Sequence, residues 1–262
     1  MGRFDGKVVW ITGGGTGIGR AMALAFAAEG ARVAVSGRRE DRLAAVVESI
    51  SAQGGEALAV PVDVTDDAAV DRAAGLISDS LGRLDVAVAN AGYAVSGAAD
   101  RVDAATWRRQ LDVNVIGLVN TVRAAMPALR EHKGQVVLIG SVAAFVPARR
   151  NAPYCASKAA VHAFGEVLSA ELRGSGVSCT TLHPGFIKSE IAKVDNEGQF
   201  HAERPDKRPA KLMWEADAAA RQMVRAIARR QRVAFITGHG RIIGFLARHF
   251  PGLTWALLAR LS

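Results

Sequence analysis

A tyrosine and a lysine with helical spacing are the first residues that could do chemistry. Tyr154 and Lys158 stand four residues apart, directly after Pro153. Proline is favoured in the first turn of a helix, and residues at i and i+4 share a face, so we expect the phenol and the ammonium to be neighbours. A free tyrosine has a pKa of about 10, too high for efficient proton transfer near neutrality. A neighbouring cation favours the phenolate, and bringing the pKa near neutrality requires roughly 3–4 kcal/mol. The pair therefore predicts a tyrosine acid/base.

A serine and a histidine flank this pair in the expected fold. Ser141 follows the apolar run 134–139, at the end of an expected strand. Parallel α/β sheets place ligand-contacting groups there, and its hydroxyl could polarise a substrate carbonyl. His183, beside Pro184, is a rival acid/base, but we expect a structural role because the tyrosine already fills that task.

A glycine-rich turn lies between the first apolar run and the first helical segment. Residues 12–19 read Thr-Gly-Gly-Gly-Thr-Gly-Ile-Gly. Glycines let the backbone turn sharply and approach a pyrophosphate, which then faces the N–H groups and the positive end of the helix dipole. The alternative is a plain tight turn, but the position between strand and helix favours a phosphate site.

Two arginines follow the second apolar run, which ends in Ser36 and Gly37. Dinucleotide folds that use NAD place an acidic side chain near this point to hold the ribose 2′-hydroxyl, whereas an arginine accommodates a 2′-phosphate. The acid is absent, and Arg38 and Arg39 come next. Bidentate phosphate recognition by Arg38 favours NADP over NAD. Alternatively, both arginines simply begin a solvated helix.

Short apolar runs alternate with longer segments of helical period along the whole chain. The runs are residues 7–12, 31–36, 56–61, 84–89, 134–139, 177–182 and 232–237. The helical segments are residues 19–29, 41–53, 66–81, 107–131, 153–173 and 215–230. Apolar runs of this length are typical of strands that are covered on both faces. We therefore predict an α/β, Rossmann-type doubly wound sheet of seven parallel strands flanked by helices on both faces, as a single domain over residues 1–262.

Composition excludes several other classes of protein. A mean hydropathy of +0.14 and a charged fraction of 22% exclude a disordered chain. The net charge of +8 favours an anionic partner, but we find no nucleic-acid recognition motif. Cys155 and Cys179 suit neither a disulfide framework nor a zinc site, and we expect no bound metal. The first residues lack a signal-peptide pattern, so we expect a cytoplasmic protein.

Together these motifs resemble the short-chain dehydrogenase/reductase family, in its subgroup of single-domain subunits. The matching residues are the turn at 12–19, Asp63-Val64, Asn90-Ala91-Gly92, Asn114, Ser141, Tyr154, Lys158 and Pro184-Gly185. Each motif is short, but their order and spacing are highly specific and cover nearly the whole chain.

The resemblance implies a catalytic role for four residues. Tyr154 would be the general acid/base, and Ser141 would orient the substrate oxygen. Lys158 would bind the nicotinamide ribose and lower the pKa of the tyrosine. Asn114 would hold a water that links Lys158 to solvent, although a buried structural amide is the alternative for this residue.

The resemblance also implies which residues bind the cofactor. Asp63 and Val64 would flank the adenine, and Asn90, Ala91 and Gly92 would form the cofactor floor. The remaining expected contacts are Gly13, Gly15, Thr16, Gly17, Ile18 and Gly19 at the pyrophosphate, Arg38 and Arg39 at the 2′-phosphate, Tyr154 and Lys158 at the ribose, and Pro184, Gly185, Ile187 and Ser189 at the carboxamide.

Two positions depart from the family pattern. Ser189 stands where the family usually has threonine, which keeps the hydroxyl. Thr16 stands where many NADP-preferring members carry a basic residue, so one of two basic clamps is missing. NADP(H) remains the preferred cofactor, with NAD(H) as the alternative.

Two segments do not follow the alternation of strands and helices. Residues 186–214 are rich in charge, and we interpret them as a substrate lid. The tail, residues 241–262, is amphipathic: one face carries Ile242, Ile243, Leu246 and Phe250, and beyond Pro251 lie Trp255, Leu258 and Leu261. The tail could pack on protein or lie on a membrane surface. The resemblance favours a homodimer or homotetramer.

The expected function is NADP(H)-dependent interconversion of a secondary alcohol and a ketone, as in a carbonyl reductase. The residues expected around the carbonyl are mostly apolar, which favours a hydrophobic substrate: residues 142–146, Tyr93 to Val95, Phe186, Met213 and Trp214. The alternative is an NADP-binding regulator or scaffold without turnover. A non-catalytic binder has no need of Tyr154, so the enzyme is favoured.

Overall fold

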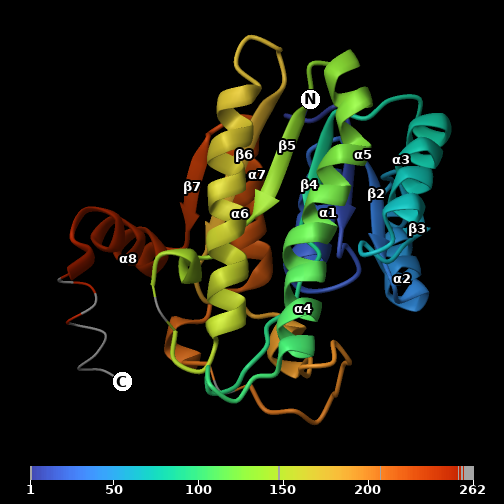
Figure 1. The fold of residues 1–262 in the computed structure, drawn as a ribbon. Coiled ribbons are helices and arrows are strands. Elements are labelled where there is room, and N and C mark those ends of the chain that lie inside the picture. Colours follow the sequence, from blue (N-terminus) through green and yellow to red (C-terminus); the bar gives the residue numbers. More distant parts are fainter. Residues whose placement is uncertain (1, 147, 207, 253, 255, 257–262) are drawn as a thin grey trace.

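The protein is built around a parallel β-sheet (Figure 1). The computed structural model describes residues 2–146, 148–206, 208–252, 254 and 256. Within these residues the sheet has seven strands in the order β3-β2-β1-β4-β5-β6-β7, and all neighbouring strands pair in parallel. The strands are β1 (Val8–Thr12), β2 (Arg32–Gly37), β3 (Ala57–Pro61), β4 (Val86–Ala89), β5 (Gln135–Ile139), β6 (Ser178–Pro184) and β7 (Val233–Ile236). The predicted seven-stranded parallel sheet is confirmed.

Helices cover both faces of the sheet. Helices α1, α2 and α7 contribute to the hydrophobic core on one face, and α3, α5 and α6 to the core on the other. The helices of the described residues are α1 (Gly17–Ala27), α2 (Glu40–Ser51), α3 (Asp67–Leu81), α4 (Ala104–Leu111), α5 (Gly117–Glu131), α6 (Ala152–Glu171), α7 (Ala216–Ala228) and α8 (Gly238–His249). This two-sided cover is the doubly wound arrangement predicted from the sequence.

Strand β1 shows why the apolar runs are continuous. All five of its residues are buried. Val9 and Ile11 point into the core shared with α1 and α7, whereas Val8 and Trp10 point into the opposite core. Because successive strand residues face opposite sides, a sheet covered on both faces requires apolar residues at every position.

The predicted helix over residues 107–131 is divided in the structure. Helix α4 begins earlier, at Ala104, and a π-helical turn (Asp112–Ile116) separates it from α5. This turn buries Asn114 completely, with its side chain bonded to groups outside the helix. The predicted helical segment over residues 107–131 is therefore confirmed, but a π-helical turn interrupts its regular period. Such π turns are often found at functional sites.

The C-terminal segment packs differently from its predicted amphipathic face. Helix α8 lies beside β7 and buries Gly240 and Gly244, where a Cβ atom at Gly244 would overlap the Phe235 ring. Ile242 and Phe250 are exposed, as is Phe245, so the predicted apolar face is not the buried one. The reason is that close approach to Phe235 requires glycine rather than a large side chain. The expectations for Trp255, Leu258 and Leu261 lie outside the described residues.

Residues 186–214 run across the carboxyl ends of the strands (Figure 1). They contain two short 3₁₀ turns, Glu190–Lys193 and Ala210–Leu212. Isolated bridges join Ile187 to Trp214 and Val194 to Phe200. Across the described part of the chain, no helix has the length and apolar character needed to cross a membrane.

Helix α6 carries Tyr154 and Lys158, and its distance from the sheet depends on Gly165. A Cβ atom there would overlap the Thr181 hydroxyl oxygen and lie 3.1 Å from Leu138. We predict that Gly165→Ala destabilises the protein by about 1–3 kcal/mol in denaturant unfolding, despite the better helix propensity of alanine.

Gly75 in α3 is the matched control for this prediction, because nothing lies within 4 Å of a Cβ atom placed there. Gly75→Ala should stabilise the protein by up to about 1 kcal/mol. Equal effects of the two substitutions would contradict the packing argument for Gly165.

Candidate active site

A cavity of about 610 Å³ opens at the carboxyl ends of the central strands. Every predicted cofactor-binding residue lines it: Gly13, Gly15, Thr16, Gly17, Ile18, Gly19, Arg38, Arg39, Asp63, Val64, Asn90, Ala91, Gly92, Tyr154, Lys158, Pro184, Gly185, Ile187 and Ser189. Of the predicted catalytic residues, Ser141, Tyr154 and Lys158 also line it, whereas Asn114 does not. Residues from almost the whole length of the chain therefore meet in one cavity.

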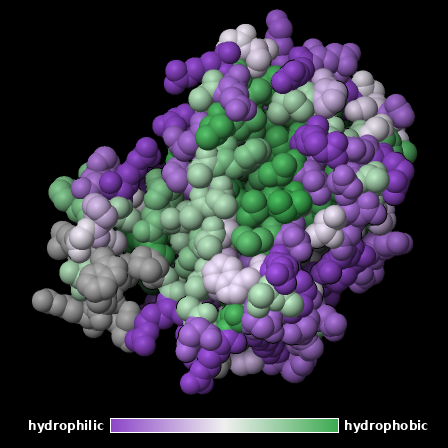
Figure 2. Space-filling view, in the orientation of Figure 1, coloured by the Kyte–Doolittle hydropathy of each residue, from purple (hydrophilic) through white to green (hydrophobic). Residues whose placement is uncertain are grey.

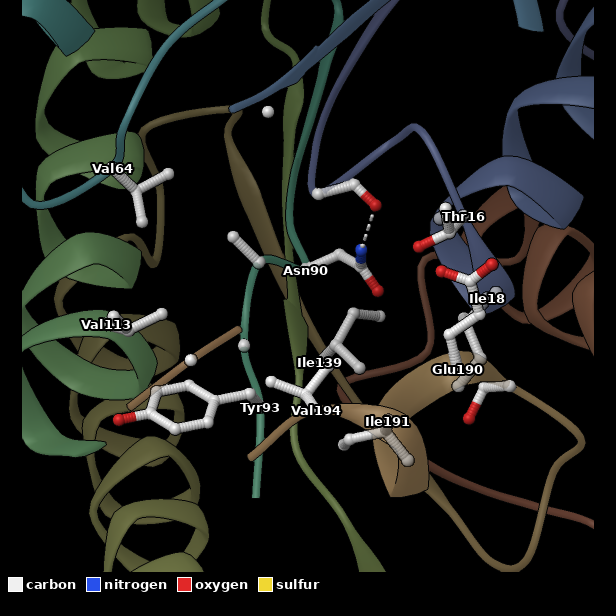
Figure 3. A pocket seen from close by; sticks show the side chains of 18 of the residues that line it. Thr16, Ile18, Val64, Asn90, Tyr93, Val113, Ile139, Glu190, Ile191 and Val194 are labelled. Carbon is white, nitrogen blue, oxygen red and sulfur yellow. Dashed lines mark hydrogen bonds between the residues drawn. The ribbon is translucent and has the colours of Figure 1, made fainter. Parts of the chain in front are cut away.

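The glycine turn packs directly on the loop after β4. The Asn90 side-chain amide donates to the carbonyl oxygens of Thr12 at 2.9 Å and Gly13 at 3.1 Å, and Figure 3 draws one hydrogen bond from this amide as a dashed line. A Cβ atom at Gly13 would lie 2.8 Å from the Ala91 Cα atom, and one at Gly19 would overlap the Gly13 oxygen. Gly13 also has a φ of +64°, which favours glycine. The turn thus leads into the N-terminus of α1 without side chains in the way.

Arg38 and Arg39 reach the cavity from the end of β2, and both contact residues 186–214. The Arg38 guanidinium donates to the Gly198 carbonyl oxygen at 2.9 Å. Arg39 pairs with Glu190 at 3.0 Å and lies 5.2 Å from the centroid of the Phe200 ring. The Arg39 guanidinium also lies 3.3 Å from the Thr16 hydroxyl oxygen. A basic group therefore stands beside Thr16, although the sequence has none at that position.

Side chains from distant parts of the sequence face each other across the cavity. Figure 3 shows Val64 and Val113 on one side and Thr16, Ile18 and Glu190 on the other. The Asp63 carboxylate accepts hydrogen bonds from the Thr65 backbone N–H and hydroxyl, at 3.0 and 2.8 Å. These contacts fix the loop after β3 at the edge of the cavity.

Tyr154, Lys158 and Ser141 come together at the opposite end from Arg38. The Lys158 ammonium lies 5.7 Å from the centroid of the Tyr154 ring and donates to the Ile139 carbonyl oxygen at 2.8 Å. Ser141 caps a 3₁₀ turn, where its hydroxyl oxygen accepts the Ala143 N–H at 3.1 Å. The predicted grouping of these three side chains is therefore present in the geometry.

Burial is the largest influence on the pKa values of Tyr154 and Lys158. It raises the pKa of Tyr154 above its ordinary value, while a hydrogen bond with Ser141 and the positive charge of Arg208 act in the opposite direction. Burial also lowers the pKa of Lys158 to about 8. The pKa of Tyr154 is therefore raised and not lowered as expected from Lys158, whose ammonium donates to the Ile139 carbonyl oxygen instead. The phenol therefore carries its proton at neutral pH.

Asn114 is a structural amide in this geometry. Its side-chain nitrogen donates to the Tyr93 carbonyl oxygen and to the Ser157 hydroxyl, both at 3.0 Å, and its oxygen accepts the Tyr93 N–H at 3.1 Å. These contacts tie the loop after β4 to α6. The side chain thus has no free N–H donor for the predicted water, and its oxygen already accepts one hydrogen bond, which favours the alternative stated from sequence.

The turn after β6 is supported by the C-terminal helix. His239 accepts hydrogen bonds at its Nε2 atom from the Phe186 N–H at 3.1 Å and the Thr237 hydroxyl at 3.2 Å. Burial lowers the pKa of His239, which favours the neutral ring that these bonds require. Thr237 has a φ of +82°, a strained conformation for a β-branched residue. Gly185 lies directly against both side chains, which leaves no room for a Cβ atom.

Sequence reasoning missed several residues of the site. Arg109, Glu190, Glu197, Phe200 and Arg208 all line the cavity. They lie on α4 or in the segment 186–214, where no periodic pattern marks a position as pointing inward. The only signal of the four charged residues was their charge, which is far more often a feature of solvated surface, and Phe200 carried no signal at all.

The apolar wall predicted around the substrate is corrected in part. Of those residues only Tyr93 lines the cavity within the described chain. Phe145 instead packs against His162, His183 and Phe235, with ring centroids 4.6, 4.8 and 5.3 Å away. The 3₁₀ turn after Ser141 directs this ring into the protein, toward aromatic partners that the sequence could not identify. His183 is fully buried in this cluster, in agreement with the structural role predicted for it.

Comparisons with known proteins agree with this architecture. The family model described as short chain dehydrogenase matches residues 7–199. A short chain dehydrogenase of Pseudocercospora fijiensis is 37% identical over 208 residues, which cover 78% of this chain and 67% of that protein.

Two solved structures share the fold. A short chain dehydrogenase/reductase from Burkholderia phymatum, in complex with NAD, superposes with a TM-score of 0.86 at 28% identity and covers 97% of this chain and 96% of that one. A short chain dehydrogenase from Burkholderia cenocepacia J2315, in complex with NADP, has a TM-score of 0.79 at 31% identity, covering 91% of this chain and 99% of that one.

The sheet order and its two layers of helices define a Rossmann-type α/β protein. The chain belongs to the short-chain dehydrogenase family, a family of oxidoreductases.

His183 supplies a test of the aromatic cluster that lies under Ser141. Its Nδ1 atom lies 3.1 Å from the Ser141 carbonyl oxygen, and burial lowers its pKa from 6.5 to about 3. As the pH falls below the unfolded pKa, the unfolded chain binds a proton that the folded chain excludes. We therefore predict that stability falls between pH 6 and pH 4, by up to about 1.4 kcal/mol per pH unit from this residue.

Denaturant unfolding at several pH values measures this slope. His183→Asn keeps a donor for Ser141 and removes the titrating group, so its slope should be shallower than that of the wild type. His249→Asn, at an exposed position, is the control and should leave the slope unchanged. If the unfolding free energy of His183→Asn fell with pH as steeply as that of the wild type, the His183 ring would titrate freely in the folded protein and the prediction would be contradicted.

Proposed function

We propose that the protein is an NADP(H)-dependent oxidoreductase that interconverts a secondary alcohol and a ketone on a mainly hydrophobic substrate. The observation that carries the proposal is the single cavity with a glycine turn and arginines at one end and Ser141, Tyr154 and Lys158 at the other. An elongated dinucleotide fits such a cavity with its phosphates and its reactive ring at opposite ends.

The residues present fit a nicotinamide dinucleotide. Side chains at Gly13 and Gly19 would fill the space beside the start of α1, and both positions are glycine. The Thr16 side chain makes no capping hydrogen bond to the first turn of α1, so the N–H groups of that turn would face a pyrophosphate, which the positive end of the helix dipole favours. When bound, the cofactor supplies hydride chemistry, and the protein supplies binding, orientation and a proton.

Tyr154 is proposed as the proton donor in the direction of carbonyl reduction. Because burial keeps its phenol protonated, it can give a proton to the oxygen that gains charge as the carbonyl is reduced. Ser141 would orient the same oxygen with its hydroxyl. Lys158 would hold the nicotinamide ribose, which needs the ammonium to exchange Ile139 for the ribose hydroxyls. For Asn114, both side-chain N–H groups are engaged, so the proposed water link to solvent would depend on the remaining acceptor capacity of its side-chain oxygen.

Arg38 and Arg39 support the preference for NADP over NAD. Both line the cavity where the end of β2 meets it, and Gly37 precedes them without an acidic group. Arg39 beside Thr16 would supply the second basic clamp that the sequence seemed to lack. The two structural neighbours were solved with NAD and with NADP, so the family alone does not decide the cofactor.

The segment 186–214 is proposed as a lid over the cavity. Two apolar surfaces are proposed as contacts with other subunits or with a membrane. The lid would close over the cofactor through Gly198, Glu190 and Phe200. Figure 2 shows hydrophobic surface gathered between α5 and α6, which suits a homodimer or homotetramer. The exposed Ile242, Phe245 and Phe250 of the tail suit packing on a partner subunit or contact with a membrane surface.

Replacement of the proposed proton donor gives the sharpest test of catalysis. Tyr154→Phe should lower the rate of NADPH oxidation by about 10²–10⁴-fold while NADPH binding is kept, because only the acidic hydroxyl is lost. Tyr93→Phe removes the hydroxyl of the other tyrosine and should keep the rate within about tenfold. An unchanged rate in Tyr154→Phe would exclude the mechanism.

Cofactor choice is tested by reversing the charge at the end of β2. Arg38→Asp should weaken NADPH binding and improve the ratio of kcat/KM for NADH over NADPH by about tenfold or more, since an acid favours the 2′-hydroxyl and repels the 2′-phosphate. Arg42→Asp makes the same change of charge at a residue that does not line the cavity, and should change that ratio by less than about threefold. Equal effects would mean that Arg38 acts only through net charge.

A further inference from the structure

We propose that Arg208 is a positioning residue that holds the turn Ile187–Ser189 in place for the nicotinamide end of the cofactor. This inference rests on the proposed function, because the turn contacts a cofactor only if the cavity binds a nicotinamide dinucleotide. Arg208 lies far from the family motifs in sequence, yet it lines the same cavity as Ser141 and Tyr154.

The guanidinium of Arg208 joins two parts of the lid. One terminal nitrogen, NH1, donates to the Ile187 carbonyl oxygen at 3.0 Å and to the Ser189 hydroxyl at 3.4 Å. The other, NH2, donates to the Ser189 carbonyl oxygen at 3.1 Å and to the Asp206 carboxylate at 2.8 Å. The Nε atom completes the pair with Asp206 at 2.9 Å. All five N–H donors therefore have acceptors within the chain.

This contact pattern points to positioning and not to ligand recognition. A guanidinium with every donor engaged has none left for a substrate anion, whereas its planar fork fixes three acceptors on the turn at once. A lysine ammonium has no such fork and could not reach both carbonyl oxygens and Asp206 in this geometry. Only about a fifth of the Arg208 side chain is exposed, with 22% relative accessibility, so water competes poorly for these bonds.

The clamped turn is the part of the lid that continues from β6. Ile187 is buried and pairs with Trp214, and the Lys188 N–H donates to the Trp214 carbonyl oxygen at 2.9 Å. Ser189 faces Gly17 at the start of α1, where a Cβ atom would lie 3.1 Å from the Ser189 Cβ atom. Arg208 thus ties the returning end of the lid to a turn that lies between the glycine turn and Tyr154. Its charge also acts on the Tyr154 phenol, in the direction that lowers the pKa.

The test compares Arg208→Lys and Arg208→Gln with Arg204→Lys. Arg204 is also a partly buried lid arginine, but it donates to the Val194 carbonyl oxygen and does not line the cavity. The first readout is hydrogen exchange of the backbone amides at residues 187–189 in the protein without added cofactor. Both Arg208 variants should speed this exchange by about tenfold, the factor expected for one lost charge-assisted hydrogen bond, and Arg204→Lys should not.

The second readout is binding and turnover with NADPH. The Arg208 variants should raise the Kd and KM for NADPH by about tenfold, whereas Arg204→Lys should leave both within about twofold. Arg208→Gln removes the positive charge that lowers the pKa of Tyr154, so this variant alone should also shift the acidic pKa of the kcat profile upward. Wild-type exchange and wild-type KM in Arg208→Lys would overturn the proposal. If the wild type binds neither NADPH nor NADH, the proposed function fails, and the exchange result still decides whether Arg208 holds the turn.

Discussion

The close approach of the glycine turn to the loop after β4 is the constraint on which the rest of the site depends. Asn90 joins the two by hydrogen bonds to the carbonyl oxygens of Thr12 and Gly13, and Gly13 and Gly19 leave no space for a side chain between them. This contact sets where α1 begins. It also leaves a cavity between neighbouring strands whose other walls come from the loops after β2, β5 and β6. Substitution at either glycine would move the start of α1 and change the shape of the whole cavity.

Electrostatics divides the cavity into two ends with different tasks. At one end Arg38 and Arg39 face the segment 186–214, so an anionic ligand there competes with Glu190 and the Gly198 carbonyl oxygen. At the other end burial keeps Tyr154 protonated and lowers the pKa of Lys158 to about 8. The net charge of +8 first indicated only an anionic partner, and the structure assigns a small part of it to this cavity.

Local sequence signals were sufficient to predict the sheet, the glycine turn and the proximity of Tyr154 and Lys158. Each depends on period, spacing or the conformational freedom of glycine, all of which are present in a short stretch of sequence. The π turn at Asn114 was missed because it depends on partners at Tyr93 and Ser157, which are distant in sequence. Arg208 and His239 were missed for the same reason. The wall at Phe145 was wrong because the direction of a side chain in a 3₁₀ turn depends on packing with His162 and His183.

The central proposal is that the protein reduces hydrophobic ketones with NADPH in this cavity. The most direct measurement is cofactor oxidation by the wild-type protein over a panel of hydrophobic ketones, small polyols and sugars, with NADPH and NADH in parallel. The account predicts turnover of hydrophobic ketones, with kcat/KM at least about tenfold higher for NADPH than for NADH. Turnover confined to small polyols or sugars, or a preference for NADH, would contradict it.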